Sequence, residues 1–289
     1  MDYQGTVIRP PSEADSIILQ VTVGCSHNRC TFCGAYKGER FRYKDEAVID
    51  QDLHYAASHY GDKNHLFLAD GDVLIIPQQR LVPLLKKIRE QLPRVRRIRL
   101  YGNRKSITSK TLAELVELKG LGLDRIYMGL ESGDDEVLAA IRKGSTAEQM
   151  IAAGQKVRAA GIFLSVTVLL GIAGLDRSPR HAVATAQVLN RMHPNQIAAL
   201  TLMPMAGTPL HDQMGQGSFT LPDEMSLLRE LQTMLHHLEL DKVQFQANHA
   251  SNFLPLDCRL QRDKSATMTL IAKALAGDIP LMPDYLRGL

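Results

Sequence analysis

The stretch VGCSHNRCTFCGAY, from Val23 to Tyr36, holds three of the four cysteines in this chain of 289 residues. Cys25, Cys30 and Cys33 follow a C-x4-C-x2-C spacing, on a segment short enough for three thiolates to converge on one centre. Disulfide pairing would leave one of these thiols over. The spacing therefore favours a metal centre.

Two kinds of metal centre fit these thiols. Zinc is one, because His27 would complete a tetrahedral site of three cysteines and one histidine, although structural zinc sites usually draw their ligands from two short knuckles. A cluster with four irons is the other. Three cysteines then leave one iron without a protein thiolate, and a substrate or cosubstrate can take that position.

The composition is that of a globular chain, with 45% hydrophobic and 22% charged residues and a net charge of +3. The longest apolar runs, such as 162–173, are shorter than the roughly 18 residues that suggest a membrane span. The N-terminus has no basic region followed by an apolar one, so we expect no secretory signal. These features predict a cytoplasmic protein with reduced thiols and no membrane partner.

One segment is strongly basic. Between Lys86 and Lys105, nine Lys and Arg residues stand against the single acidic residue Glu90. A solvated helix surface explains this pattern, and an anion-binding or RNA-binding surface is the alternative.

Apolar runs of strand length alternate with amphipathic stretches of helix length, which predicts an α/β fold with a mainly parallel sheet. Strands are expected near 17–23, 65–70, 97–101, 124–130, 162–170 and 196–203. Helices are expected near 45–60, 78–92, 108–119, 146–160, 179–192 and 222–239. Six such units fit a partial (βα)6 TIM-like barrel. We expect an N-terminal segment at 1–16, the barrel at 17–210 and, at 211–289, a C-terminal extension that covers the barrel opening.

Chemically unusual residues follow each predicted strand, and in a parallel barrel these strand ends lie on the rim where active sites form. In chain order these residues are Cys25, Asp70-Gly71-Asp72, Tyr101-Gly102-Asn103, Glu131-Ser132-Gly133, Gly171 and Pro204.

Together these motifs resemble those of the radical S-adenosylmethionine (radical SAM) enzymes, in the group related to oxygen-independent coproporphyrinogen oxidase and the elongator-like enzymes. The spacing is one residue longer than the usual C-x3-C-x2-C, but Phe32 matches the aromatic residue before the final cysteine. The resemblance implies that Cys25, Cys30 and Cys33 hold a [4Fe–4S] cluster whose open iron binds SAM. Reductive cleavage of SAM would then give methionine and a 5′-deoxyadenosyl radical, which abstracts hydrogen from the substrate.

The resemblance covers roughly residues 17–210 and also implies contacts with SAM. The turn Asp70-Gly71-Asp72 would receive its amino group, Glu131 with Ser132 its ribose, and Lys143, with Arg142 second, its carboxylate. Gly171, Met203 and Pro204 would wall the adenine site, and Phe32 would lie beside the cofactor.

The substrate is not identified by these motifs. In NHASNFLPLDC, the polar residues Asn248, His249 and Asn252 are candidate substrate contacts, together with Asn103. The alternative is a loop capped by its own Asn and Ser side chains. Cys258 stands alone, so we expect no second cluster and interpret Cys258 as a small buried residue.

As a radical SAM enzyme the protein would need an electron donor such as flavodoxin or ferredoxin. Its substrate would be a small molecule, with RNA as the second choice. Two other functions stay open at this point. A zinc-stabilised RNA-binding protein would explain the thiols and the basic segment, and a non-catalytic iron–sulfur protein for electron transfer would explain the thiols alone.

Overall fold

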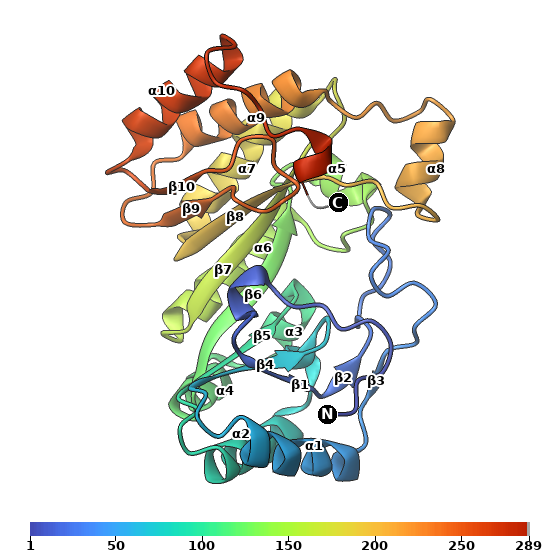
Figure 1. The fold of residues 1–289 in the computed structure, drawn as a ribbon, viewed down its shortest axis with the longest axis vertical. Coiled ribbons are helices and arrows are strands. Elements are labelled where there is room, and N and C mark those ends of the chain that lie inside the picture. The colour runs from blue at the N-terminus through green and yellow to red at the C-terminus, as the bar shows by residue number, and fades with distance from the viewer. Residues whose placement is uncertain (288–289) are drawn as a thin grey trace. The chain divides into compact units, whose positions relative to one another are not determined.

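The computed structural model describes residues 1–287, which form two compact units (Figure 1). Residues 1–28, 35–128 and 155–164 form the first unit, and residues 29–34 and 129–154 with the chain from 165 onward form the second. Four segments contribute residues to both units, namely the cysteine loop at residues 24–36, β6 (Leu123–Glu131), α6 (Ala147–Ala159) and β7 (Phe163–Leu170).

The strands form a mainly parallel sheet in the order β1-β4-β5-β6-β7-β8-β9-β10, which confirms the predicted α/β class. Its strands are β1 Ile17–Gln20, β4 His65–Ala69, β5 Arg97–Tyr101, β6 Leu123–Glu131, β7 Phe163–Leu170, β8 Gln196–Thr201, β9 Gln244–Gln246 and β10 Asp257–Arg259. A separate antiparallel pair consists of β2 Thr22–Val23 and β3 Arg42–Tyr43.

Helices connect most of the parallel strands. They are α1 Glu46–His59, α2 Gln78–Gln91, α3 Arg104–Ser109, α4 Leu112–Gly120, α5 Asp135–Ala140, α6 Ala147–Ala159, α7 Ser178–Met192, α8 Pro209–Gly215, α9 Glu224–His237 and α10 Lys264–Leu275. Short 3-10 turns occupy Pro11–Glu13, Val73–Ile75 and Asp284–Leu286. None of the helices in this described part of the chain has both the length and the apolar character needed to cross a bilayer.

The first unit buries both faces of its strands. In β4, Leu66 and Leu68 point to one face and are fully buried, while Phe67 and Ala69 point to the other and pack with Tyr127. Burial on both faces is what parallel strands covered by helices require. Figure 1 shows α1 and α2 side by side in this unit.

The helix predicted at 108–119 is two helices, α3 and α4. Lys110 lies between them with an extended backbone, and Thr111 is the N-cap of α4. The Thr111 hydroxyl accepts the Glu114 N–H while the Glu114 carboxylate accepts the Thr111 N–H. This capping box starts a new helix where the apolar periodicity alone suggests continuation.

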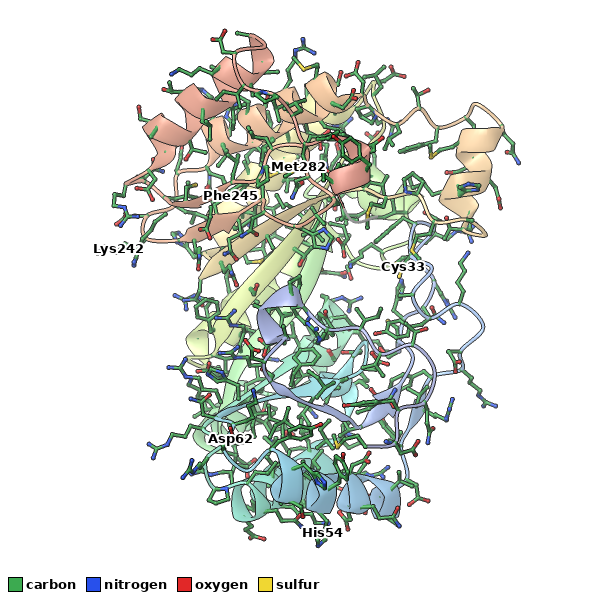
Figure 2. All side chains as sticks on the ribbon, viewed as in Figure 1. Cys33, His54, Asp62, Lys242, Phe245 and Met282 are labelled. Atoms are coloured by element: carbon green, nitrogen blue, oxygen red, sulfur yellow. The ribbon has the colours of Figure 1, made fainter. Side chains whose placement is uncertain are left out.

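The second unit extends past the predicted barrel strands. β7 and β8 pair in parallel, β8 and β9 pair in parallel, and β9 and β10 are antiparallel. Phe245 of β9 is fully buried, and Figure 2 shows its side chain within this unit. β9, β10 and α10 were not predicted, because strands of three residues carry no readable alternation. A boundary at residue 210 and a covering role for the extension stay predictions.

Candidate functional site

The cysteine loop follows β2 directly. Cys25, Cys30 and Cys33 are half-buried and form no disulfide, and His27 on the same loop is also half-buried. Residues 29–34 belong to the second unit, so the loop contributes thiols to both units. Within residues 1–287, no group of three or more His, Cys, Asp or Glu side chains is already arranged as a metal site. The fit of an iron–sulfur cluster therefore rests on the donors, three partly accessible thiols on one loop.

Backbone hydrogen bonds fix the second half of the loop, residues 29–34. The Thr31 N–H donates to the Ile141 carbonyl, and the Thr31 carbonyl accepts the Leu210 N–H, both at 3.0 Å. Phe32 packs against the apolar cluster that contains Ile141 and Leu210. The Phe32 ring thus anchors the loop, and its contact with SAM stays a prediction.

Tyr36, to which the sequence assigned no role, joins the cysteine loop to the turn after β4. Its hydroxyl donates to Asp70 Oδ1 at 2.5 Å, and Gln20 Nε2 donates to Asp70 Oδ2 at 3.3 Å. The ring lies so close to Gly71 that a Cβ there would come within 2.7 Å of Tyr36 Cε2 and 3.1 Å of Cys25 Cβ. Burial raises the pKa of Asp70 and that of the Tyr36 phenol, which the bond to Asp70 raises further. The close packing requires glycine at this turn.

Asp72 connects three loops of the first unit. Its fully buried carboxylate accepts hydrogen bonds from the Ser26 hydroxyl and from Asn103, whose Nδ2 lies 2.7 Å away and whose backbone N lies 3.2 Å away. The Asn103 Oδ1 also accepts the Ser106 N–H, which caps α3. Burial raises the pKa of Asp72. The Asn103 amide is therefore used for positioning, and its predicted contact with substrate stays a prediction.

Glu131 and Lys143 form an ion pair in the second unit. Lys143 Nζ lies 2.8 Å from Glu131 Oε1, and only 14% and 11% of the two side chains are exposed. Glu131 has a φ of +66°, a backbone conformation that is strained for a residue with a side chain and that recurs at functional sites. Arg142, the second candidate for the carboxylate, is exposed on the surface and also has a positive φ, +54°. The two residues predicted for ribose and carboxylate thus lie together.

Ser132 is buried beside the ion pair and does not face solvent. Its hydroxyl lies 2.8 Å from His181 Nδ1 of α7 and accepts the Asp134 N–H at 3.0 Å. Burial lowers the pKa of His181 from 6.5 to about 4, so its ring is neutral at pH 7. Ser132 therefore connects the loop after β6 to α7.

The loop after β7 begins at Gly171, whose φ is +82°. Its N–H donates to Glu230 Oε1 of α9 at 2.8 Å. Met203 and Pro204 follow β8, and 40% of Met203 is exposed. The contact of Gly171, Met203 and Pro204 with adenine stays a prediction.

The tail segment contains both buried and exposed polar residues. Asn252 is buried, and its Nδ2 donates to the Ala199 carbonyl at 2.9 Å while its Oδ1 accepts the Thr201 hydroxyl at 3.0 Å. Asn248 is exposed, and the half-buried His249 has its Nδ1 2.9 Å from the Ser251 hydroxyl. Asn252 thus holds β8, whereas the role of all three in substrate binding stays a prediction.

Sequence reasoning missed Tyr36, His181 and Glu230. Glu230 had a readable signal, because a carboxylate occupies an otherwise apolar face of α9. Tyr36 had a weaker one, an aromatic residue three positions after the last cysteine of the motif. His181 had none, since its buried position depends on the packing of α7.

Comparison with known proteins identifies the family of the chain. A family model described as the Radical SAM superfamily matches residues 19–186, more than half of the chain. A curated relative, 4′-phospho-dehydrooxetanocin synthase from Priestia megaterium, is 26% identical over 176 residues, which are 54% of this chain and 23% of that protein. Neither a zinc-stabilised RNA-binding protein nor a non-catalytic iron–sulfur protein is supported by these matches.

Solved structures share the fold. Methylornithine synthase (PylB) has a TM-score of 0.55 at 15% identity, over 78% of this chain and 64% of that chain. Coproporphyrinogen III oxidase (HemN) from Escherichia coli gives 0.56 at 18% identity, over 76% and 51%. An archaeal Elp3 from Methanocaldococcus infernus gives 0.54 at 11% identity, over 91% and 63%. The chain spans less than two thirds of the length of each of these relatives.

These neighbours confirm the predicted partial TIM-like barrel and the resemblance to the coproporphyrinogen oxidase and elongator group at the level of the fold. The family match confirms the two cofactors that the cysteine motif indicates, a [4Fe–4S] cluster and SAM. The chain belongs to the radical SAM superfamily, whose enzymes use a [4Fe–4S] cluster to cleave S-adenosylmethionine reductively.

Proposed function

We propose that this protein binds a [4Fe–4S] cluster through Cys25, Cys30 and Cys33, cleaves SAM and abstracts hydrogen from a second substrate. The observation that carries the proposal is the C-x4-C-x2-C loop, with three half-buried thiols outside any disulfide and inside the family match. When bound, the cluster supplies the electron that cleaves SAM to methionine and a 5′-deoxyadenosyl radical. The protein residues bind and orient the partners of that reaction.

The turn after β4 is proposed to receive the amino group of SAM. Asp70 and Asp72 are buried carboxylates whose pKa values are raised by burial. An ammonium group nearby would favour their charged forms, and charge-assisted hydrogen bonds are strong in such partly dry surroundings. Because Asp72 already accepts bonds from Ser26 and Asn103, it would also hold the shape of the turn.

Glu131 and Lys143 are proposed to bind the ribose and the carboxylate of SAM. The Lys143 ammonium has three hydrogens, so it can keep its bond to Glu131 while it donates to a second carboxylate. Glu131 keeps a second oxygen for ribose hydroxyls. Arg142 is the second candidate for the carboxylate, and Phe32, Ser132, Gly171, Met203 and Pro204 complete the proposed cofactor contacts.

The second substrate is proposed to be a small molecule. The name of the curated relative, 4′-phospho-dehydrooxetanocin synthase, is that of an enzyme that makes a small molecule, which supports this choice over RNA. An electron donor of the flavodoxin or ferredoxin kind would reduce the cluster, and a reducing cytoplasmic compartment would keep the three thiols available. Asn248, His249, Asn252 and Asn103 are the proposed substrate contacts.

The test uses protein reconstituted anaerobically with iron and sulfide. We expect about four irons and four sulfides per chain. With SAM, a reductant and an extract of cells grown in deuterated medium, deuterium should appear in 5′-deoxyadenosine. Separating the extract into small-molecule and RNA fractions distinguishes the two substrate classes.

A variant of the cysteine outside the motif serves as the control. Cys258 is buried in β10, so Cys258→Ala should retain the iron and the deuterium transfer. Stoichiometric zinc without sulfide in anaerobically purified protein would contradict the proposal. Iron and sulfide without SAM cleavage would leave a cluster protein that is not an enzyme.

A further inference from the structure

A buried carboxylate outside the family match contacts the loop after β7. Glu230 lies on α9 and is 2% exposed. Its Oε1 accepts the Gly171 N–H at 2.8 Å, and its Oε2 accepts the Ser178 hydroxyl. His181 Nε2 lies 3.4 Å from the same Oε1 but makes no hydrogen bond to it. The family match ends at residue 186, so the helix that carries this carboxylate belongs to the chain's own extension.

Burial of the Glu230 carboxylate lowers the stability of the fold unless other interactions compensate it. Its neighbours on the buried face of α9 are apolar, among them Leu227, Leu231 and Met234. A buried carboxylate costs several kcal/mol unless hydrogen bonds and favourable charges compensate it, whereas a leucine would pack there without that cost. Burial also raises the pKa of Glu230 to about 7. Part of the compensation comes from α7, because the carboxylate meets Ser178 at the positive N-terminal end of that helix.

One hydrogen bond of Glu230 leads to a loop of the proposed cofactor site, and its contact with His181 leads to a second loop. Gly171 opens the loop after β7, and a Cβ at this position would lie 2.9 Å from Leu227 Cδ2, so α9 packs directly against the glycine. His181 continues the network to the loop after β6, since its Nδ1 lies 2.8 Å from the Ser132 hydroxyl. A single carboxylate therefore holds one loop by a hydrogen bond and packs against the histidine that bonds to the other.

We propose that Glu230 is a positioning residue of the SAM site, which fixes the Gly171 backbone by a hydrogen bond and packs against His181, the partner of Ser132. This inference rests on the proposed cofactor roles of Gly171 and Ser132. It makes α9, which lies outside the family match, a working part of the cofactor site. A glycine backbone with a positive φ has no side chain to hold it in place, so the orientation of its N–H depends on an external acceptor.

The experiment compares three variants of the full chain, each reconstituted with its cluster. Glu230→Ala removes the acceptor, Glu230→Gln keeps an oxygen for the Gly171 N–H, and Met234→Ala opens a cavity on the same buried helix face. The dissociation constant for SAM is measured well below each melting temperature, together with the iron content and that temperature. We expect Glu230→Ala to bind SAM about tenfold more weakly at unchanged iron content, as the loss of one buried hydrogen bond implies.

A purely structural role would give a different pattern. If Glu230 positions the SAM site, Glu230→Gln should bind SAM within about threefold of wild type, and Met234→Ala should lower the melting temperature without weakening SAM binding. If Glu230 only stabilises the fold, affinity should fall in step with melting temperature in every variant. If Glu230→Ala binds SAM as tightly as wild type, or if Met234→Ala weakens binding as much at an equal loss of melting temperature, the inference is overturned. If Glu230→Ala does not fold, Ser178→Ala, which removes one donor to the same carboxylate, takes its place with an expected loss of affinity of about threefold. A wild-type protein that holds its cluster but does not bind SAM would instead contradict the proposed function.

Discussion

Asp72 and Glu230 are both buried carboxylates, yet they differ in how they are held. Asp72, in the first unit, accepts hydrogen bonds from the neutral residues Ser26 and Asn103, which lie on loops at the ends of other strands. Glu230, in the second unit, lies on a helix and faces a glycine N–H, a serine and a histidine. Asp72 itself lies on a loop at a strand end, whereas Glu230 lies on helix α9 and bonds to the loop after β7.

The difference shows that the two parts of the chain stabilise their loops by different means. In the first unit the loops after β2, β4 and β5 hydrogen-bond to each other through Asp72 and Asn103. In the second unit the loops after β6 and β7 depend on α7 and α9 through His181 and Glu230. We therefore expect mutations of the first network to act on the site alone, and mutations of the second to act on the site and on helix packing.

The largest expected effect comes from the cysteine loop, which contributes residues to both units. Replacement of Cys25, Cys30 or Cys33 by Ala should abolish stable cluster binding, because two thiolates do not hold a cluster that needs three. Iron and sulfide analysis of anaerobically reconstituted protein checks this outcome.

His27→Ala is the matched control for the cysteine variants, since His27 lies on the same loop and is also half-buried. It should retain nearly all of the iron. A loss as large as that of a cysteine variant would make His27 a ligand and reopen the zinc site of three cysteines and one histidine.

The next effect concerns the carboxylate network of the first unit. Asp72→Ala should keep the cluster but weaken SAM binding by about 1–3 kcal/mol, because one charge-assisted bond is lost and Asn103 loses its partner. Lys143→Ala should give a loss of similar size in the second unit, where it removes the ammonium that is bonded to Glu131 and is the proposed donor to the SAM carboxylate. Titration of reconstituted protein with SAM measures both.

Asp72→Asn separates charge from shape. It keeps an acceptor for the Ser26 hydroxyl but loses the negative charge, so SAM should bind with an intermediate affinity if the ammonium is the partner. Loss of the cluster with unchanged SAM affinity would show that the turn serves the cysteine loop through Tyr36 and not SAM.

The sequence predicted what local pattern controls. The polar turns Asp70-Gly71-Asp72 and Glu131-Ser132 were readable because each lies at the end of an apolar run, while their contacts with SAM stay predictions. The ion pair between Glu131 and Lys143 is an observation of the structure. The parallel order followed from the alternation of strands and helices.

The remaining features depend on long-range packing, and the partner that each residue meets has no local signal. Glu230 and Gly171 are separated by 59 positions, and the Tyr36 hydroxyl meets Asp70 across 34. Helix periodicity likewise did not predict the break at Thr111, because the capping box is a hydrogen-bond pattern and not a hydrophobic one. Such residues become readable only when a charged group interrupts an apolar helix face, as Glu230 does.

A smaller effect is expected in the pH dependence of folding. Burial lowers the pKa of His181 from 6.5 to about 4 and raises that of Glu230 from 4.5 to about 7. The neutral histidine makes the free energy of unfolding rise with pH between about 4 and 6.5, because the unfolded chain binds the extra proton. The protonated glutamic acid makes it fall between 4.5 and about 7, because the folded chain binds the extra proton. In wild type the two trends oppose each other where they overlap.

Single variants should separate the two trends. With Glu230→Gln the free energy of unfolding should rise with pH between pH 5.5 and 6.5, and its slope should exceed that of wild type by up to about 1 kcal/mol per pH unit. With His181→Asn it should fall with pH over the same range. Urea denaturation at several pH values measures both slopes, and identical slopes in the two variants would exclude this coupling.

The smallest effect on stability is expected at His249 in the tail, whose carbonyl accepts the N–H of Asn252, the buried residue that holds β8. Asn252→Ala leaves the Ala199 carbonyl and the Thr201 hydroxyl without their buried partner, so the free energy of unfolding should fall by about 1–3 kcal/mol. Uncoupled SAM cleavage and deuterium transfer to 5′-deoxyadenosine should both fall with it. His249 is half-buried, and water can replace its bond to Ser251, so His249→Ala should change the free energy of unfolding by less than about 0.5 kcal/mol.

The activity of His249→Ala then decides whether the tail contacts substrate. Burial lowers the pKa of His249, so the ring is neutral at pH 7 and offers one donor and one acceptor. If it holds the substrate, the variant should cleave SAM at the uncoupled rate but transfer less deuterium to 5′-deoxyadenosine, because transfer needs the target carbon held near contact distance. If uncoupled cleavage and melting temperature fall together in His249→Ala as they do in Asn252→Ala, the segment is a structural cap, and the substrate contacts must lie elsewhere in the chain.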